Sequence, residues 1–203
     1  MSQIRRLRRT DATILPWKNG RGETAQIALW PPHGEFGRGD FDWRLSRAAV
    51  VEDGAFSSFP GFDRALVIVE GQGLRLDHGG GEPPAVLRAL SPYRFSGDDA
   101  TTATLIDGPI RDCNLIWRRA RVKAVVRVFS DAGREASVDI GGDHAIIHGI
   151  AGTIDVTIGD GLESFELAPF ETLWIQGGAA RGSARIRPRD SAGAWIVARL
   201  DEL

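Results

Sequence analysis

Hydrophobic and polar residues alternate along many short segments of this chain, which predicts β-strands rather than helices. In the segment 24–30, alternation groups Ala25 with Leu29 on one face and Thr24 with Gln26 on the other. No segment keeps a helical period, and 25 glycines separate many short strands. We therefore predict an all-β fold, either a sandwich or a barrel.

The segment 65–69 has the pattern of a buried strand and follows the turn dipeptide Pro60-Gly61. Alternation places Arg64 on the same face as Leu66 and Ile68. An arginine in line with large apolar side chains either extends to solvent at the strand end or is held for a partner.

The two halves of the chain carry similar patterns. In residues 65–93, an apolar strand runs into a glycine-containing turn, a returning strand and a Leu-x-Pro-aromatic motif, and residues 144–170 repeat this order. We infer two structural repeats, residues 1–120 and residues 121–203. Chance matching of glycine-rich β sequence is the alternative explanation.

Composition excludes several classes of protein. A net charge of −2 argues against a general nucleic-acid binder, and the basic run in residues 5–9 belongs either to a solvated strand or to a contact with an acidic or phosphate partner. The single cysteine, Cys113, excludes an internal disulfide and is typical of a small core residue. No apolar stretch approaches ~18 residues, so we expect no membrane span. The N-terminal arginines lack a following apolar core, so we expect no signal peptide and a cytoplasmic location.

Four ordered motifs carry a family resemblance. They read Pro-Trp-Lys-Asn-Gly-Arg-Gly-Glu-Thr at 16–24, Phe-Asp-Trp-Arg-Leu-Ser at 41–46, Gly-Ala-Phe-Ser-Ser-Phe-Pro-Gly-Phe-Asp-Arg at 54–64 and Leu-Ile-Asp-Gly-Pro-Ile-Arg-Asp-Cys-Asn-Leu at 105–115. Together they resemble the HutD/Ves family. The resemblance implies a bicupin, with two jelly-roll β-barrels packed as one body. It also implies a link to histidine utilisation, with a formylglutamate-like metabolite as a suggested ligand and no established enzymatic activity.

The histidines do not match the metal pattern of many cupins, which has two histidines two residues apart, a carboxylate and a later histidine. His144 and His148 are the most closely spaced pair. On a strand, four residues span roughly 13 Å, which is too far for one metal ion. We therefore expect no metal and no cofactor.

Polar and aromatic side chains in the first repeat are the candidates for a ligand site. The candidate ligand-binding residues are Trp17, Lys18, Asn19, Thr24, Arg44, Ser46, Phe59, Arg64 and Asn114. Arginine recognises a carboxylate through two parallel hydrogen bonds. Trp43 and Phe62 are further candidates for the apolar walls of such a site. The alternative is that Arg44 and Arg64 pair with acids, namely Asp42, Asp63 or Asp107.

These observations favour a metal-independent protein that binds a small carboxylate metabolite in histidine or amino-acid catabolism or its regulation. One alternative is a metal-free isomerase, lyase or hydrolase that uses Lys18 or Glu23 as acid or base. Another is an interaction protein without a small ligand. The sequence leaves the oligomeric state open, and a homodimer is one option.

Overall fold

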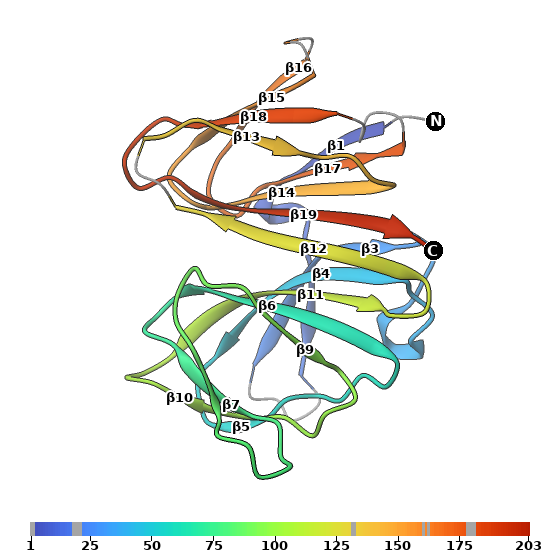
Figure 1. The fold of residues 1–203 in the computed structure, drawn as a ribbon, viewed down its shortest axis with the longest axis vertical. Helices are drawn as coiled ribbons and strands as arrows, with labels where there is room; N and C mark the ends of the chain where they lie inside the picture. Colours follow the sequence, from blue (N-terminus) through green and yellow to red (C-terminus); the bar gives the residue numbers. More distant parts are fainter. Residues whose placement is uncertain (1–2, 18–21, 131–132, 160, 162, 178–181) are drawn as a thin grey trace. The chain divides into compact units, whose positions relative to one another are not determined.

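The computed structural model describes residues 3–17, 22–130, 133–159, 161, 163–177 and 182–203, and nearly all of their regular structure is β-strand (Figure 1). Two short 3₁₀ helices, η1 (Arg9–Asp11) and η2 (Phe36–Arg38), are the helical elements of these residues. None of the described helices has the length and apolar character that crossing a membrane requires. The chain divides into an N-terminal unit, residues 12–122, and a C-terminal unit, residues 1–11 with 123–203.

The N-terminal unit contains a six-stranded and a four-stranded sheet. The six-stranded sheet has the order β2 (Thr13–Pro16), β3 (Glu23–Trp30), β4 (Trp43–Val50), β11 (Ile110–Arg118), β6 (Phe62–Glu70) and β9 (Tyr93–Ser96). The four-stranded sheet has the order β5 (Gly54–Ala55), β10 (Thr102–Leu105), β7 (Leu74–Asp77) and β8 (Ala85–Leu87). Leu66 and Ile68 of the first sheet share a buried cluster with Leu74 and Leu76 of the second. The two sheets therefore enclose one interior.

A β-bulge changes the face assignment that simple alternation gives for β3. The pairing of β3 with β4 shifts register between Gln26 and Ala28. A bulge inserts one extra residue into one strand and reverses the alternation beyond it. Leu29 consequently lies opposite Arg44, on the same face as Gln26, and the expected grouping of Leu29 with Ala25 is wrong.

The C-terminal unit also contains two sheets. The five-stranded sheet has the order β1 (Gln3–Leu7), β17 (Thr172–Gln176), β14 (His144–Ala151), β19 (Ala194–Glu202) and β12 (Val122–Phe129). The four-stranded sheet has the order β13 (Ala136–Asp139), β18 (Ser183–Pro188), β15 (Ile154–Ile158) and β16 (Glu163–Leu167). The sequence division at residue 120 groups β1 with the first repeat, whereas β1 pairs antiparallel with β17 of this unit.

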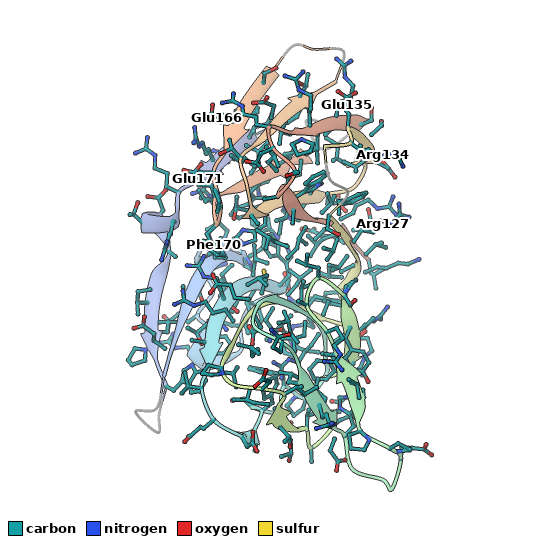
Figure 2. The ribbon with its side chains drawn as sticks, turned by 90° about the vertical axis from the view of Figure 1, so that its left-hand side faces the viewer. Arg127, Arg134, Glu135, Glu166, Phe170 and Glu171 are labelled. Atoms are coloured by element: carbon teal, nitrogen blue, oxygen red, sulfur yellow. The ribbon has the colours of Figure 1, made fainter. Side chains whose placement is uncertain are left out.

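Side-chain contacts hold β1 in this sheet as well as its backbone pairing. Arg6 donates to Glu171 at 2.6 Å, and the Arg5 guanidinium lies 5.1 Å from the centre of the Trp174 ring. Glu171 and the adjacent Phe170 precede β17 (Figure 2). Two arginines of the basic run therefore contact side chains of their own unit.

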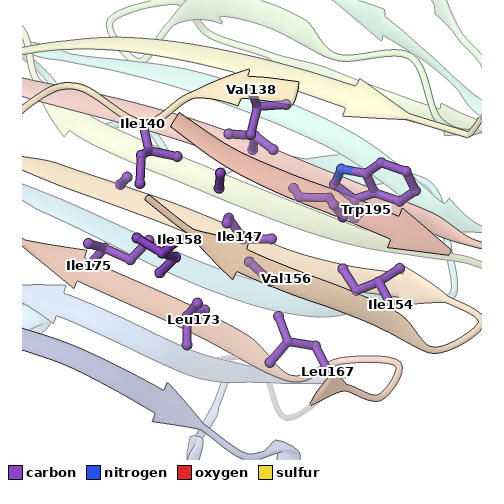
Figure 3. Close-up of a cluster of buried hydrophobic side chains, with 14 residues drawn as sticks. Val138, Ile140, Ile147, Ile154, Val156, Ile158, Leu167, Leu173, Ile175 and Trp195 are labelled. Carbon is purple, nitrogen blue, oxygen red and sulfur yellow. The ribbon is translucent and has the colours of Figure 1, made fainter. Parts of the chain in front are cut away.

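The interior of the C-terminal unit is apolar (Figure 3). Its buried cluster takes side chains from both sheets, including Ile147 and Trp195 from one and Ile154 and Val156 from the other. The expected all-β fold is confirmed in both units. The strand pairing of the described residues gives two facing sheets in each unit, as in a double-sheet jelly roll, and closes no barrel.

Candidate functional site

Two buried arginines lie in one row across the interior face of the six-stranded sheet. Ile116 of β11 is opposite Arg44 of β4 on one side and opposite Arg64 of β6 on the other. Residues directly opposite each other share a face, so both arginines face the same interior. They stand two strands apart, which separates their Cα atoms by roughly 10 Å.

Arg44 is 4% exposed and has only part of its hydrogen-bonding capacity used. Its Nε donates to Gln26 Oε1 at 3.0 Å, and its guanidinium stacks 3.8 Å from the centre of the Phe36 ring. Its Nη2 has no hydrogen-bond partner among the described residues. This arginine is held in place by an amide and an aromatic ring rather than by an acid.

Arg64 is 5% exposed and lies among three aromatic rings. Its guanidinium is 4.8 Å from the centre of the Phe95 ring, 5.2 Å from Phe56 and 5.4 Å from Phe59. Its Nη1 donates to the carbonyl of Ser57 at 3.2 Å, whereas its Nε has no partner among the described residues. Arg64 therefore also keeps an unused donor.

Burial makes both positive charges costly. It lowers the pKa of Arg44 to about 10, and repulsion from Arg64 adds to this lowering. Burial likewise lowers the pKa of Arg64 to about 10, against the attraction of Asp112. Both groups remain charged at neutral pH, and each would be stabilised by an anion placed between them.

A second row on the same face supplies uncharged polar groups. Ser46 is opposite Gln26 of β3 and Asn114 of β11, and both Ser46 and Asn114 are buried. The Asn114 side-chain oxygen has no hydrogen-bond partner among the described residues. The polar groups therefore form a continuous patch beside the arginine pair.

A buried acid, Asp112, completes this patch. It is two residues before Asn114 on β11 and therefore shares its face. Burial raises the pKa of Asp112 to about 7, even though the nearby Arg64 charge and a backbone hydrogen bond from Ala48 favour the ionised form. Its Oδ1 has no hydrogen-bond partner among the described residues.

The alternative in which nearby acids neutralise Arg44 and Arg64 is not what the described residues show. Asp63 accepts from Arg94 at 2.5 Å and from Arg119 at 2.7 Å. Asp42 accepts from Arg121 at 3.1 Å. Asp107 is exposed, in a positive-φ turn conformation. Asp42 and Asp63 therefore have other cationic partners.

The other expected site residues differ in whether they contact this patch. The Trp17 indole nitrogen donates to the Thr24 hydroxyl at 2.9 Å, and Thr24 lies in the same row as Asp112, with Ala48 between them. Phe59 contacts the Arg64 guanidinium directly. Lys18 and Asn19 lie outside the described residues.

One of the two additional wall candidates is on the wrong face. Trp43 is adjacent to Arg44 in β4, so its side chain points to the opposite side of the sheet. Phe62 shares the interior face and packs with Ile116 and Leu29. The expectation for Trp43 is therefore corrected, because alternation within β4 excludes it from the interior.

Sequence reasoning missed Asp112 and Phe36. Asp112 carried a usable signal, because its spacing of two from Asn114 predicts a shared strand face. Phe36 lies in η2, a short helix between β3 and β4, and its ring contacts the guanidinium of Arg44 in β4. Nothing in the local sequence around Phe36 indicates that contact.

The histidines and the cysteine contribute little to this patch. Within the described part of the chain, no three His, Cys, Asp or Glu side chains are grouped so that they could hold a metal ion. His148 bonds the Thr172 hydroxyl at 2.8 Å, in the C-terminal unit. Cys113 is buried next to Asp112, and burial raises the pKa of its thiol to about 12. A thiol with that pKa is a poor nucleophile at neutral pH.

Glu23, expected as an alternative acid or base, is exposed at the start of β3. The interior patch thus offers two cations with unused donors, amide and hydroxyl groups, aromatic walls and one acid that titrates near neutrality. This combination is suited to binding a small anion.

Comparisons with known proteins place these features in a family. The fold recurs in proteins of low sequence identity: an oxalate decarboxylase from Lactobacillus farciminis shares it with a TM-score of 0.62 at 7% identity, covering 96% of this chain and 85% of that one. The HutD family model matches residues 9–192. The chain therefore belongs to the HutD family.

Individual relatives agree with this assignment. The chain is 38% identical over 134 residues to an uncharacterised 21.2 kDa protein in the hutC 3′ region of Pseudomonas putida, covering 66% of this chain and 68% of that protein. It is 40% identical over 113 residues to the protein Ves of Citrobacter koseri, covering 55% and 56% respectively, so it matches just over half of that relative. The structure of HutD from Pseudomonas fluorescens SBW25, in a formate condition, aligns with a TM-score of 0.81 at 30% identity, covering 99% of this chain and 100% of that one.

Proposed function

We propose that the N-terminal unit binds a small carboxylate metabolite between Arg44 and Arg64, without a metal ion, as part of histidine or amino-acid catabolism or its regulation. The observation that carries this proposal is the buried arginine pair with unused donors on Arg44 Nη2 and Arg64 Nε. Burying a cation without a partner is costly. A bound carboxylate would offset that cost and accept both free N–H groups.

The surroundings of the pair support an anion of organic character. Phe36 stacks on Arg44 and three aromatic rings surround Arg64. Such walls suit a ligand with a short carbon skeleton. The P. putida relative is described by its position beside hutC, and the P. fluorescens HutD was solved in a formate condition, which makes histidine-pathway carboxylates the first compounds to test.

The test is a calorimetric titration of the intact protein with formate, glutarate, glutamate and N-formylglutamate, preceded by a thermal-shift screen. A ligand that binds only the native state raises its melting temperature by mass action. We expect at least one carboxylate to bind and its uncharged amide analogue to bind much less tightly.

Arg44→Lys and Arg64→Lys provide the matched variants. An ammonium cannot reproduce the planar donor pair of arginine, so we expect each variant to lose roughly ten- to a hundredfold in affinity. Arg75→Lys is the control, because Arg75 is an exposed arginine of β7 in the same unit. Binding that survives both interior substitutions unchanged would contradict the proposal.

A further inference from the structure

Asp112 is a buried carboxyl group on the same sheet face as the arginine pair, it interacts electrostatically with Arg64, and it has one unused oxygen. It is 3% exposed, it receives a backbone hydrogen bond from Ala48, and its Oδ1 has no partner among the described residues. It lies opposite Ile68 of β6, four residues along that strand from Arg64. Even spacing along β6 places Ile68 and Arg64 on one face.

The charged and titratable groups around Asp112 can be named from each packed strand. On the interior face of the described six-stranded sheet they are Arg44 of β4, Arg64 of β6, Arg118 of β11 and Tyr93 of β9, whose hydroxyl is 3.0 Å from His78 Nε2. Arg118 already pairs with Asp42 at 3.9 Å and donates to the carbonyl of Gly39. The four-stranded sheet contributes apolar side chains to the interior, namely Leu74, Leu76, Leu87 and Ala103. Among these groups, Arg44 and Arg64 are the buried cations for which the described residues give no ion pair, and Asp112 is the buried carboxyl group.

We propose that Asp112 determines the charge of the ligand that the site accepts: a dicarboxylate binds with Asp112 protonated, and its binding takes up one proton from solvent. This inference rests on the proposed carboxylate-binding function. The two negative charges of a dicarboxylate balance Arg44 and Arg64. An ionised Asp112 would then add an unbalanced negative charge in a buried site, which is strongly unfavourable.

Protonation removes that charge and creates a new donor. The proton leaves the buffer and binds a carboxyl oxygen of Asp112, and the resulting O–H group can donate to a carboxylate oxygen of the ligand. A monocarboxylate leaves one arginine charge for Asp112 to balance, so Asp112 stays ionised in that complex. Because the pKa of Asp112 is about 7 in the free protein, ligand binding can change its protonation near neutral pH.

The experiment compares glutarate with its monoamide, which has nearly the same shape and one negative charge fewer. Calorimetric titrations at about pH 8, in two buffers with different ionisation enthalpies, give the number of protons bound. For glutarate we expect uptake approaching one proton per site and an affinity that falls roughly tenfold per pH unit above the pKa of Asp112. For the monoamide we expect uptake near zero and an affinity that changes little with pH.

Asp112→Asn supplies the matched variant, because asparagine keeps the shape and cannot ionise. We expect it to bind glutarate without proton uptake and with an affinity that stays constant between about pH 6.5 and pH 8.5. Asp107→Asn is the control, since Asp107 is exposed and its positive-φ conformation suits asparagine. The control is expected to keep the proton uptake of the natural protein.

The outcomes separate this inference from the proposed function. Glutarate binding without proton uptake, or with uptake that persists in Asp112→Asn, would overturn the role of Asp112 and leave carboxylate binding intact. If neither glutarate nor its monoamide binds, the role of Asp112 as a selector of ligand charge is overturned. If no carboxylate of the broader screen binds either, the proposed function fails with it. The buffer comparison needs only the natural protein, so it remains decisive if Asp112→Asn does not fold.

Discussion

The interiors of the two units are enclosed by similar pairs of sheets but contain different side chains. In the C-terminal unit, the buried cluster between the sheets consists of aliphatic residues and Trp195 (Figure 3). In the N-terminal unit, the interior face of the larger sheet carries Arg44, Arg64, Asp112 and Asn114, all buried. Members of two apolar clusters, such as Ile116 and Leu66, stand in the same rows as these polar residues.

This difference indicates that the two interiors contribute differently to stability. An apolar interior gains free energy from each side chain that it buries. A buried charge without a partner does the opposite, and proteins accept such a cost mainly at functional sites. The proposed ligand site therefore lies in the N-terminal unit, whereas the apolar interior of the C-terminal unit contributes to stability.

The largest effect is expected from removing residues 1–11, which deletes β1. This exposes the edge of β17 and the apolar side chains that Ile4 helps to cover. We expect the truncated protein to lose the buried environment of Trp195 and to aggregate, as measured by tryptophan fluorescence and light scattering. Adding a peptide of residues 1–12 is expected to restore part of the folded signal.

Arg6→Ala is the control for this truncation. It removes only the ion pair with Glu171, in which Arg6 is 42% exposed, and is expected to cost less than about 1 kcal/mol. A truncated protein that melts at the temperature of the full chain would show that β1 contributes little to the C-terminal unit.

A pair of core substitutions tests the contrast between the two interiors. Ile147→Ala creates a cavity in the C-terminal cluster and is expected to cost about 2–5 kcal/mol of unfolding free energy. Arg44→Met removes a buried charge that has no acid partner among the described residues, so we expect a change below about 1 kcal/mol, in either direction. Urea unfolding measures both. Equal losses of unfolding free energy for the two substitutions would contradict this difference between the two interiors.

Asp112→Asn is expected to change how stability depends on pH. The carboxyl has a pKa of about 7 in the folded protein and an ordinary value of 3.8. Between these values the folded state binds more protons than the unfolded state, so stability falls as the pH rises and stays low above pH 7. This pKa difference of about three units corresponds to about 4 kcal/mol of unfolding free energy. Relative to the natural protein, the variant should therefore gain up to about 4 kcal/mol between about pH 4 and pH 8.

Chemical unfolding of both proteins across this pH range provides the measurement. The control is Asp107→Asn, which should follow the natural protein at every pH. If Asp112→Asn shows the same pH dependence as the natural protein, then Asp112 is not the group that titrates.

The smallest effect on stability is expected at His144, where the dependence of stability on pH has the opposite sign to that at Asp112. Burial lowers the pKa of His144 below 6.5, against the attraction of Glu202. The unfolded state therefore takes up a proton more readily, and stability is lost as the pH falls below the ordinary value. His144→Gln should reduce this loss in acid, as followed by thermal melting from about pH 7 to pH 5, whereas His33→Gln, at an exposed position, should not. A His144→Gln variant as acid-sensitive as the natural protein would exclude this role.

The local pattern of the chain was sufficient for the fold class and for part of the candidate site. Alternation placed Arg64 with Leu66 and Ile68, and those residues do share one face of β6. The same rule applied to β11 would have added Asp112 to Asn114. The four motifs pointed to the family to which the chain belongs. In these cases the relevant information lies within one strand, where a period of two fixes the direction of each side chain.

Other features depended on which strands pair and in what register. Only the pairing of β4, β11 and β6 places Arg44 and Arg64 on either side of Ile116, and only the bulge in β3 brings Leu29 to that face. The insertion of β1 beside β17 joins residues from opposite ends of the sequence. Alternation is a local property of one strand, whereas pairing is set by hydrogen bonds and packing between segments far apart in the chain. The sequence therefore determined the strands and the direction of their side chains, and the tertiary structure decided which of those side chains meet.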